Sequence, residues 1–388
     1  MEREMGVGRM SGIYIIADSI LSPLGINTDE NFVRILKGES GLKSISRSNF
    51  DFDVYASYFE TGALEGILDD PFFATLTRFE KLLYYPIRNV LEDSQIDPRS
   101  SRTLFVIATT KGNIELLEEG IRDQKSLSLY NSACKISSHF QNPNKPIVVS
   151  NACISGISAQ IIACGLIDSG RFDTVIVVGA DTVNAFVLEG FNALKALSPG
   201  HCKPFDRDRD GINLGEAGAA MVISNQSQTN KGFKVTSIIG GAITNDANHI
   251  SGPSRTGLEM SMAIDQTLKQ AGIVSSDIDF ISAHGTGTVF NDEMESKALN
   301  NSKLDKSHIH SLKAYFGHTL GCAGLLESII AVNCLQNEVF IGSRGYSNPG
   351  TSFELNISSE HIRKPFKNCI KTMAGFGGCN AAIGFSKS

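Results

Sequence analysis

A strand, a cysteine-bearing turn and a helix follow one another in residues 147–163, IVVSNACISGISAQIIA, and this stretch decides the fold. The β-branched run 147–149 predicts a buried strand, and residues 158–163 predict a buried helix. Cys153 lies between them, where the positive end of the helix dipole favours a thiolate and can lower the pKa of the thiol. Small neighbours let another backbone approach the sulfur. A lone cysteine in such a place is more often inert core, so the other motifs must support Cys153 as a nucleophile.

The composition predicts a globular protein with a large buried core. The 388 residues are 41% hydrophobic and 20% charged. No apolar run approaches the ~18 residues of a membrane span and nothing reads as a signal peptide, so we expect no membrane contact and a cytoplasmic location. The net charge of −6 argues against nucleic-acid binding. The eight cysteines form no CxxC pair, which predicts reduced thiols rather than disulfides or a zinc site.

Strand-like and helix-like runs alternate along the chain, and uninterrupted Val/Ile runs are typical of parallel strands covered on both faces. We expect two similar α/β halves, residues 1–230 and 231–388, divided in the polar stretch 225–231 and sharing one core. The predicted strands are 13–17, 104–108, 147–149, 174–179, 234–239, 279–283, 370–374 and 381–385. The predicted helices are 31–36, 79–91 (kinked or ended at Pro86), 113–123, the one after Cys153, 258–271, 294–300 and 323–335.

A second motif, HGTGT at residues 284–288, directly follows a predicted strand. An isolated histidine at a strand end is more often structural than catalytic. Here the alternating glycines allow close approach of a ligand, and the hydroxyls of Thr286 and Thr288 can hydrogen-bond an extended, amide-bearing substrate. His284 is therefore a catalytic candidate. The acids that follow, Asp292 and Glu295, are interpreted as plain helix caps, with Asn291 or Asp292 as the N-cap.

Two further motifs lie in the second half. Lys313, His318 and Glu327 are spaced so that a turn at residues 317–318 would place His318 before a small-residue helix that contains Glu327. Lys313 would orient His318 or pair with Glu327, although a surface lysine is the alternative. The glycine-rich turn GFGGCN at 375–380 exposes backbone N–H groups that can form half of an oxyanion hole, or it is a simple hairpin.

Taken in order, these motifs resemble those of the β-ketoacyl-acyl-carrier-protein synthases of the thiolase superfamily, in the branch with a Cys-His-His triad. The resemblance covers nearly the whole chain. His318 separates the chain from relatives that condense acyl-CoA, which typically carry Asn there, and from thiolases, which use a second catalytic Cys. The other matching segments are 22–25 (SPLG), 38–41 (GESG), 203–211 (KPFDRDRDG) and 214–216 (LGE).

The resemblance implies a thiolase-like α/β fold, in which two pseudo-duplicated halves form five layers, α-β-α-β-α. It also implies that Cys153 attacks an acyl thioester and that its N–H and that of Phe376 form the oxyanion hole. His284 and His318 would act as neutral imidazoles that donate hydrogen bonds to a malonyl thioester and assist loss of CO₂. The product would be a 3-oxoacyl thioester.

The remaining roles are also implied by the resemblance. Lys313 and Glu327 would fix His318 and the local charge. Phe376 would be a gate beside the cysteine. Four residues would contact the substrate: Thr286, Thr288, Gly375 and Gly377.

No organic cofactor or metal is implied, because the 4′-phosphopantetheine arm arrives on the acyl carrier protein, the expected partner. A homodimer is expected and a heterodimer remains open. Two further readings stay open. One is a chain-length-factor-like or decarboxylating partner subunit of a ketosynthase heterodimer, and the other is a thiolase-type enzyme acting on CoA esters.

The chain departs from the family pattern in three places. Ser282 stands where the family often has Asn, so the resemblance does not imply a bound cation. Cys379 replaces Thr in the glycine-rich turn, a change that a small buried slot would tolerate. Residues 108–112 (ATTKG) replace the usual glycine-rich turn in the region that builds the acyl pocket of relatives. Acyl chain length and pathway (fatty acid, polyene or polyketide) are therefore not predicted.

Overall fold

The computed structural model describes residues 12–45, 54–227 and 233–387. The predicted division near residue 230 lies outside the described residues. Ten strands form one mixed sheet with the order β11-β10-β14-β15-β9-β1-β8-β6-β4-β5. Those of the first half are β1 (Tyr14–Leu21), β4 (Thr103–Ala108), β5 (Ile147–Val149), β6 (Thr174–Asp181) and β8 (Ala217–Ser224). Those of the second half are β9 (Thr236–Asn245), β10 (Phe280–Ser282), β11 (His308–His310), β14 (Asn368–Gly375) and β15 (Cys379–Lys387).

The two halves of the sheet have the same topology. We number the five strands of each half from 1 to 5 in chain order. From the centre of the sheet outward, the strand order is then 1-5-4-2-3 in both halves. In both halves the two central pairings are antiparallel and the two outer pairings are parallel. The halves join where Tyr14 and Ile15 of β1 pair with β9. The predicted duplication is therefore confirmed at the level of topology.

The helices form three layers around the two half-sheets. Their bounds are α1 (Thr28–Leu36), α2 (Pro71–Ala74), α3 (Arg78–Ser94), α4 (Gln124–Leu127), α5 (Leu129–His139), α6 (Ser155–Asp168), α7 (Ala185–Ala193), α8 (Leu258–Ala271), α9 (Val289–Asn301), α10 (Lys313–Phe316) and α11 (Ala323–Gln336). Short 3₁₀ helices are η1 (Ile114–Leu117), η2 (Ser275–Asp277) and η3 (Leu320–Cys322). Two small sheets contain β2 (Leu42–Ser44), β3 (Tyr55–Ser57) and β7 (Leu214–Gly215), and β12 (Val339–Phe340) and β13 (Ile362–Arg363).

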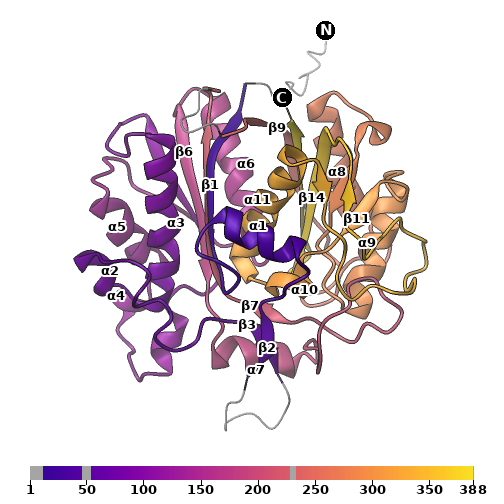
Figure 1. Cartoon of the computed structure of the whole chain (residues 1–388), viewed down its shortest axis with the longest axis horizontal. Coiled ribbons are helices and arrows are strands. Elements are labelled where there is room, and N and C mark those ends of the chain that lie inside the picture. Colours follow the sequence, from indigo (N-terminus) through magenta and orange to yellow (C-terminus); the bar gives the residue numbers. More distant parts are fainter. Residues whose placement is uncertain (1–11, 46–53, 228–232, 388) are drawn as a thin grey trace.

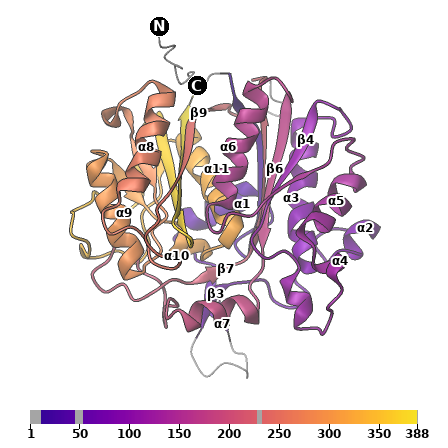
Figure 2. The same cartoon turned by 180° about the vertical axis from the view of Figure 1, so that it is seen from behind.

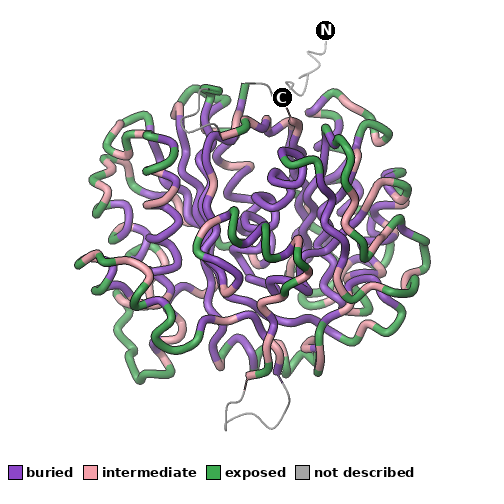
Figure 3. Tube along the Cα trace, viewed as in Figure 1, coloured by how far each residue is buried: buried purple, intermediate pink, exposed green. Residues whose placement is uncertain are grey.

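The five-layered arrangement is confirmed. Helix α3 packs on the outer face of the first half-sheet, and α8 packs on the outer face of the second (Figure 1). Helices α6 and α11 lie between the half-sheets and contact both of them (Figure 2). All fourteen residues of α11 are buried for this reason, and the burial colours place the exposed surface on the outer helices and loops (Figure 3). A helix that is buried on every side is typical of such a central layer.

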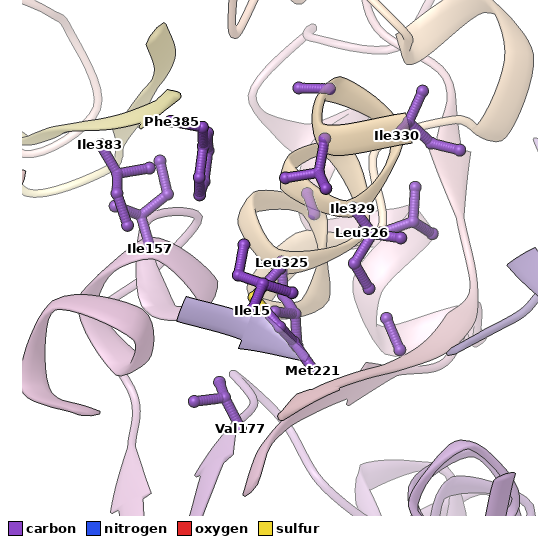
Figure 4. Packing of buried hydrophobic residues seen from close by; sticks show 14 of the residues in the cluster. Ile15, Ile157, Val177, Met221, Leu325, Leu326, Ile329, Ile330, Ile383 and Phe385 are labelled. Atoms are coloured by element: carbon purple, nitrogen blue, oxygen red, sulfur yellow. The ribbon is translucent and has the colours of Figure 1, made fainter. Parts of the chain in front are cut away.

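The central core joins both halves. Ile157 of α6 lies close to Ile383 and Phe385 of β15, and Leu325 of α11 lies near Ile15 of β1 and Met221 of β8 (Figure 4). Residues far apart in the sequence thus exclude water together, and burial of each such side chain stabilises the fold by about 1.5–3 kcal/mol. The predicted single core is present.

Two predicted helices differ from the structure. Helix α3 continues past Pro86 to Ser94, because burial of one face against β1, β6 and β8 outweighs the missing hydrogen bond. The predicted helix 113–123 is reduced to η1, so that prediction is wrong. Gly120 adopts φ +80°, and the side chain of Asn113 hydrogen-bonds Thr77, the Ser126 carbonyl and Ser132 instead of supporting a helix. Among the strands of the large sheet, β8 and β11 were not predicted, and among the described helices longer than four residues, α5 and α7 were not predicted.

Within the residues that the structure describes, no helix combines the length and the apolar character needed to cross a membrane.

Candidate active site

Cys153, His284 and His318 converge from three separate turns. Cys153 lies between β5 and α6, His284 follows β10, and His318 lies between α10 and η3. The thiol sulfur and one ring nitrogen of each histidine all lie within 4.8 Å of one another. The two rings are nearly perpendicular, at 75°, with centroids 5.2 Å apart. The structure thus brings together the three residues predicted as the triad.

A sharp turn presents Cys153 at the start of α6. Ala152 adopts φ +44°, a left-handed conformation that non-glycine residues rarely take. Ser155 stabilises the turn because its hydroxyl donates to the carbonyl of Ala152 (2.6 Å) and accepts from the N–H of Asn151 (2.8 Å). A Cβ on Gly375 would lie 3.1 Å from the Cys153 nitrogen, so only glycine leaves this amide accessible there. Backbone strain of this kind is common at active sites.

The protonation of Cys153 differs from the sequence-based prediction of a lowered pKa. Burial raises the pKa of the Cys153 thiol to about 12, and nearby Cys379 acts in the same direction. Lys313, Lys111 and the backbone N–H of Phe376, which is directed at the sulfur, act in the opposite direction but do not outweigh burial. Cys153 is a thiol at neutral pH, and its proton must leave as the sulfur attacks.

Both histidines are neutral. Burial lowers the pKa of His284 and of His318 well below 6.5, and the charges of Lys313 and Lys371 lower it further. Among the described residues, Nδ1 of His284 and both ring nitrogens of His318 have no hydrogen-bond partner. Buried polar groups are normally paired, so these unpaired nitrogens point to a ligand that supplies the partner.

A buried ion-pair cluster lies beside the histidines. Lys313 Nζ pairs with Glu327 Oε1, as one of the sequence-based alternatives predicted, and Lys371 Nζ lies 2.7 Å from Glu327 Oε2. The three side chains are at most 1% exposed. Burial raises the pKa of Glu327, but the two ammonium groups outweigh this and hold it below its ordinary value. Lys371 was not predicted, because a lysine in an apolar strand pattern reads as an exposed residue.

Glu295 holds the loop that begins with His284. Its carboxylate accepts the backbone N–H groups of His284 and Gly285, both at 2.8 Å, and the hydroxyl of Thr372 at 2.7 Å. Charge-assisted bonds of this kind are stronger than bonds between neutral groups. Glu295 therefore orients the catalytic loop, and the interpretation as a plain cap was wrong.

Asp292 holds the next part of the same loop. Its carboxylate accepts the N–H of Thr286 (2.9 Å) and the N–H of Gly287 (3.1 Å). The N-cap of α9 is Thr288, whose side chain makes no capping bond, rather than Asn291 or Asp292 as predicted. The spacing of Asp292 and Glu295 was visible in the sequence. The backbone N–H groups that they accept precede them in the chain, and the carboxylates contact these groups only because the loop folds back onto α9.

The glycine-rich turn is a hairpin between β14 and β15 that closes over Cys153. Phe376 at its tip is 40% exposed and lies against Phe191, with ring centroids 5.7 Å apart. Cys379 occupies a buried slot, where its thiol donates to the carbonyl of Phe376 at 3.5 Å. The predicted tolerance of the Thr-to-Cys departure agrees with this small buried slot.

A cavity of about 470 Å³ opens onto the three converging residues. Predicted site residues that line it are Cys153, His284, His318, Thr286, Thr288, Gly375, Phe376 and Gly377. Apolar side chains, among them Ile250 and Phe290, form part of the wall. Lys313 and Glu327 do not line the cavity and act from behind the histidines. The lining combines apolar side chains with a few polar groups, as is typical of a site for a partly apolar small molecule.

Sequence reasoning missed Asp181 at the end of β6. Its buried carboxylate accepts the N–H of Gly321 (2.7 Å) and the N–H groups of Thr110 and Lys111 (3.0 Å each). Burial raises the pKa of Asp181 from its ordinary value. Asp181 ties the turn after β4 to the turn that follows His318. An acid directly after the buried run 174–180 was the available signal.

The Cys-His-His set resembles a zinc ligand set, but its surroundings do not suit a dication. Histidines that bind zinc usually donate their second N–H to an oxygen. Within the described part of the chain, Nδ1 of His284 and both ring nitrogens of His318 lack such a partner. The ammonium groups of Lys313 and Lys371 also place positive charge beside both rings.

Comparison with known proteins agrees with this geometry. Residues 10–229, more than half of the chain, match the family described as "Beta-ketoacyl synthase, N-terminal domain", and residues 235–347 match "Beta-ketoacyl synthase, C-terminal domain". The chain is 25% identical over 413 residues to 3-oxoacyl-[acyl-carrier-protein] synthase 2 of Vibrio cholerae, which covers 97% of this chain and 99% of that protein.

Other relatives match over a shorter length. The chain is 32% identical over 247 residues to 3-oxoacyl-[acyl-carrier-protein] synthase 2 of Mycobacterium leprae, which covers 61% of this chain and 59% of the relative. This match thus spans about three fifths of the relative's length. A chain of the solved complex of the ketosynthase ApeO with its chain length factor ApeC, from Xenorhabdus doucetiae, has the same fold, with a TM-score of 0.86 and 24% identity over 100% of both chains. The fold, the order of the motifs and the family matches agree, and the chain belongs to the β-ketoacyl synthase family of the thiolase superfamily.

Proposed function

We propose that this protein is an acyltransferase that condenses an acyl group with a malonyl group on acyl carrier protein and releases CO₂. One observation carries the proposal: a buried thiol and two neutral imidazoles meet at the end of one cavity. The product is a 3-oxoacyl-acyl carrier protein, the elongated chain of a fatty acid, polyene or polyketide pathway.

Acyl transfer comes first. The sulfur of Cys153 attacks the carbonyl carbon of the acyl thioester, and the carrier's thiolate leaves with the proton that the Cys153 thiol gives up. The N–H of Cys153 and the N–H of Phe376 support the tetrahedral oxyanion. The direction of the Phe376 N–H toward the sulfur favours this arrangement. A neutral histidine beside the sulfur relays the proton.

Decarboxylation and condensation follow at the histidines. Loss of CO₂ from the malonyl thioester leaves negative charge on its thioester oxygen. Donors on the neutral rings of His284 and His318 would stabilise that charge selectively in the transition state. The enolate carbon then attacks the acyl-Cys153 carbonyl, and the sulfur leaves as a thiolate that takes up a proton from solvent water.

The substrates account for the rest of the site. Thr286 and Thr288 lie along the cavity, where their hydroxyls suit the amides of a 4′-phosphopantetheine arm. Gly375 and Gly377 let the arm pass close to the backbone beneath Phe376. The arm is covalently attached to the carrier protein, so the enzyme needs neither an organic cofactor nor a metal for this chemistry.

We further propose that the protein works in the cytoplasm as a dimer with acyl carrier protein as its partner. A homodimer is the simpler assembly. The structural likeness to a chain from a ketosynthase–chain length factor complex keeps a heterodimer as the second assembly. The convergence of Cys153 with both histidines favours the condensing subunit over a chain-length-factor-like or decarboxylating partner, because a partner of that kind does not need the nucleophile.

Intact-mass analysis tests the nucleophile directly. We expect incubation with acyl carriers of several chain lengths to add one acyl group to the native protein and none to Cys153→Ala, and the preferred length to indicate the pathway. Cys153→Gln should still decarboxylate malonyl carrier but should not condense. Acyl loading that persists in Cys153→Ala would refute the assignment. Loading absent from native protein, with CO₂ release present, would favour the partner-subunit function.

A further inference from the structure

Lys371 is a buried cation that the proposed reaction steps do not use. It lies on β14 between Ser282 of β10 and Ile383 of β15, and its side chain is 0% exposed. Ion pairs at the surface contribute little, but a fully buried ammonium is costly unless oxygen atoms surround it. The charge of Lys371 also acts on both histidines, because it lowers the pKa of His284 and of His318.

Four oxygen atoms surround the Lys371 ammonium. Nζ lies 2.8 Å from the carbonyl of Thr372 and 3.0 Å from each of the carbonyls of Ser282 and Ala283. The fourth oxygen is Glu327 Oε2, at 2.7 Å. Three backbone carbonyls and one carboxylate form an oxygen cage of the type that proteins build around a hard cation.

We propose that Lys371 is a built-in cation of this active site, a positioning residue whose ammonium stands where a cation could otherwise bind. The ammonium holds the end of β10, directly before His284, against Glu327 of α11. Glu327 in turn pairs with Lys313, so one charge joins the elements that carry His284 and His318.

Ser282 agrees with this assignment. The backbone carbonyl of Ser282 accepts a hydrogen bond from the Lys371 ammonium. Its hydroxyl has no hydrogen-bond partner among the described residues. Burial lowers the pKa of Lys371 to about 8, although Glu327 raises it, so the side chain is mainly charged at neutral pH. A separate cation does not fit, because the ammonium already fills the oxygen cage.

Chemical rescue tests the proposal. Lys371→Ala would leave a cavity lined by the four oxygens, and Lys371→Met would fill the same space with apolar atoms. In tetramethylammonium chloride, whose cation is too large to enter, we expect Lys371→Ala to have a lower melting temperature. We also expect it to decarboxylate malonyl carrier about 10–100-fold more slowly, the usual cost of losing a supporting group beside a catalytic residue. KCl, NaCl or methylammonium chloride should restore both in a saturable way.

Matched controls separate this effect from general salt effects. There are three controls: the native protein, Lys371→Met, and Lys81→Ala, which removes a buried lysine on α3. In each control, small and large cations should have the same effect on the melting temperature and on decarboxylation. Acyl loading of Cys153 should fall less than decarboxylation in Lys371→Ala, because the cage supports the histidines rather than the sulfur. A general loss of folding would lower both steps together.

Three results would overturn the proposal. One is a Lys371→Ala variant as stable and active in tetramethylammonium chloride as the native protein. Another is a native protein that itself needs K⁺ or Na⁺. The third is a variant that no small cation restores, including one that fails to fold in every salt. Because the melting temperature is measured without substrate, the cage can be tested even if the proposed condensation is wrong.

Discussion

Gly156 at the start of α6 lies against the backbone of Gly324 at the start of α11. A Cβ on Gly156 would lie 2.5 Å from the amide nitrogen of Leu325 and 3.1 Å from the carbonyl carbon of Gly324. This contact brings the amino ends of the two central helices together, and with them Cys153 and His318. These two residues from different halves can meet only because neither helix has a side chain at this point.

Gly156→Ala should therefore separate Cys153 from His318. We expect a loss of about 1–3 kcal/mol in the free energy of unfolding, because the added methyl group overlaps backbone atoms that cannot move away easily. Condensation activity should fall further than stability explains. Urea denaturation and a condensation assay measure the two effects.

Gly165→Ala is the matched control in the same helix. Nothing lies within 4 Å of a Cβ at Gly165, so alanine should stabilise α6 by up to about 1 kcal/mol through its higher helix propensity. Equal effects of the two substitutions would contradict the close-contact explanation.

His318→Ala should damage decarboxylation more than acyl loading. The ring stabilises charge that develops on the malonyl oxygen, and loss of such a group costs about 10²–10⁴-fold in rate. Release of CO₂ from malonyl carrier and the mass gain at Cys153 measure the two steps separately. A matched loss in both would mean that His318 also takes the proton from Cys153 in the slow step.

Asp181→Asn should loosen the turn after His318. The asparagine side chain has only one oxygen that can accept hydrogen bonds. Its NH₂ group would face backbone N–H groups that now donate hydrogen bonds to the Asp181 carboxylate. Leaving one such buried donor unpaired costs about 1–3 kcal/mol, which urea denaturation would detect. Asp168→Asn, at an exposed position near the end of α6, should change stability little. Equal stability of the two variants would contradict the conclusion that Asp181 holds the turn after β4 against the turn that follows His318.

The stability contributed by His310 should fall as the pH is lowered from about 6.5 to 4, while Asp18 and Asp292, whose pKa values burial raises to about 7 and to about 6, act in the opposite direction. Burial lowers the pKa of His310 to about 4, whereas the unfolded chain takes up that proton near 6.5. Within this window the unfolded state binds more protons at His310 than the folded state, so protonation favours unfolding by up to about 3 kcal/mol for this residue. His284 and His318 act in the same direction.

Urea midpoints between pH 4.5 and 7.5 measure this dependence. His310→Phe keeps the stacking on Phe340 but leaves the carbonyl of Ile341 without its partner, so it should be less stable than the native protein at pH 7.5, and this deficit should shrink as the pH falls. A deficit that does not change with pH would contradict the contribution assigned to His310.

Chelation should leave acyl loading of Cys153 unchanged. The ammonium groups of Lys313 and Lys371 disfavour a dication beside the histidines, and the proposed chemistry needs none. Intact-mass analysis should show the same acyl loading of Cys153 after dialysis against EDTA as after dialysis against buffer alone. Loss on chelation with recovery on added Zn²⁺ would instead identify the Cys-His-His set as a metal site.

The sequence was informative where a motif and its neighbours are local. The convergence of Cys153, His284 and His318, the pairing of Lys313 with Glu327 and the hairpin at Phe376 agree with their prediction. Each of these residues lies in or beside a short motif at a strand or helix end. The pKa of Cys153 was predicted in the wrong direction, because local sequence shows the helix terminus but not how deeply the two half-sheets bury it.

Partners that lie far apart in the chain could not be predicted. Lys371 and Asp181 sit in apolar strands, and the groups that they hold include backbone atoms of distant segments, Ser282 and Ala283 for Lys371 and Lys111 and Gly321 for Asp181. A sequence pattern records the polarity of one residue, whereas its hydrogen-bond partners depend on which strands become neighbours. For the same reason, the sequence predicted Asp292 and Glu295 of α9 to be helix caps, whereas the structure shows that they accept backbone N–H groups of the preceding loop.

The amino-acid sequence by itself determined the alternation of strands and helices, the family and the candidate reacting groups, because these depend on residue type and short-range order. Only the tertiary structure decided the protonation of those groups and the residues that orient them. Both depend on burial and on oxygen atoms supplied by distant segments, and these exist only once the two halves have closed around α6 and α11.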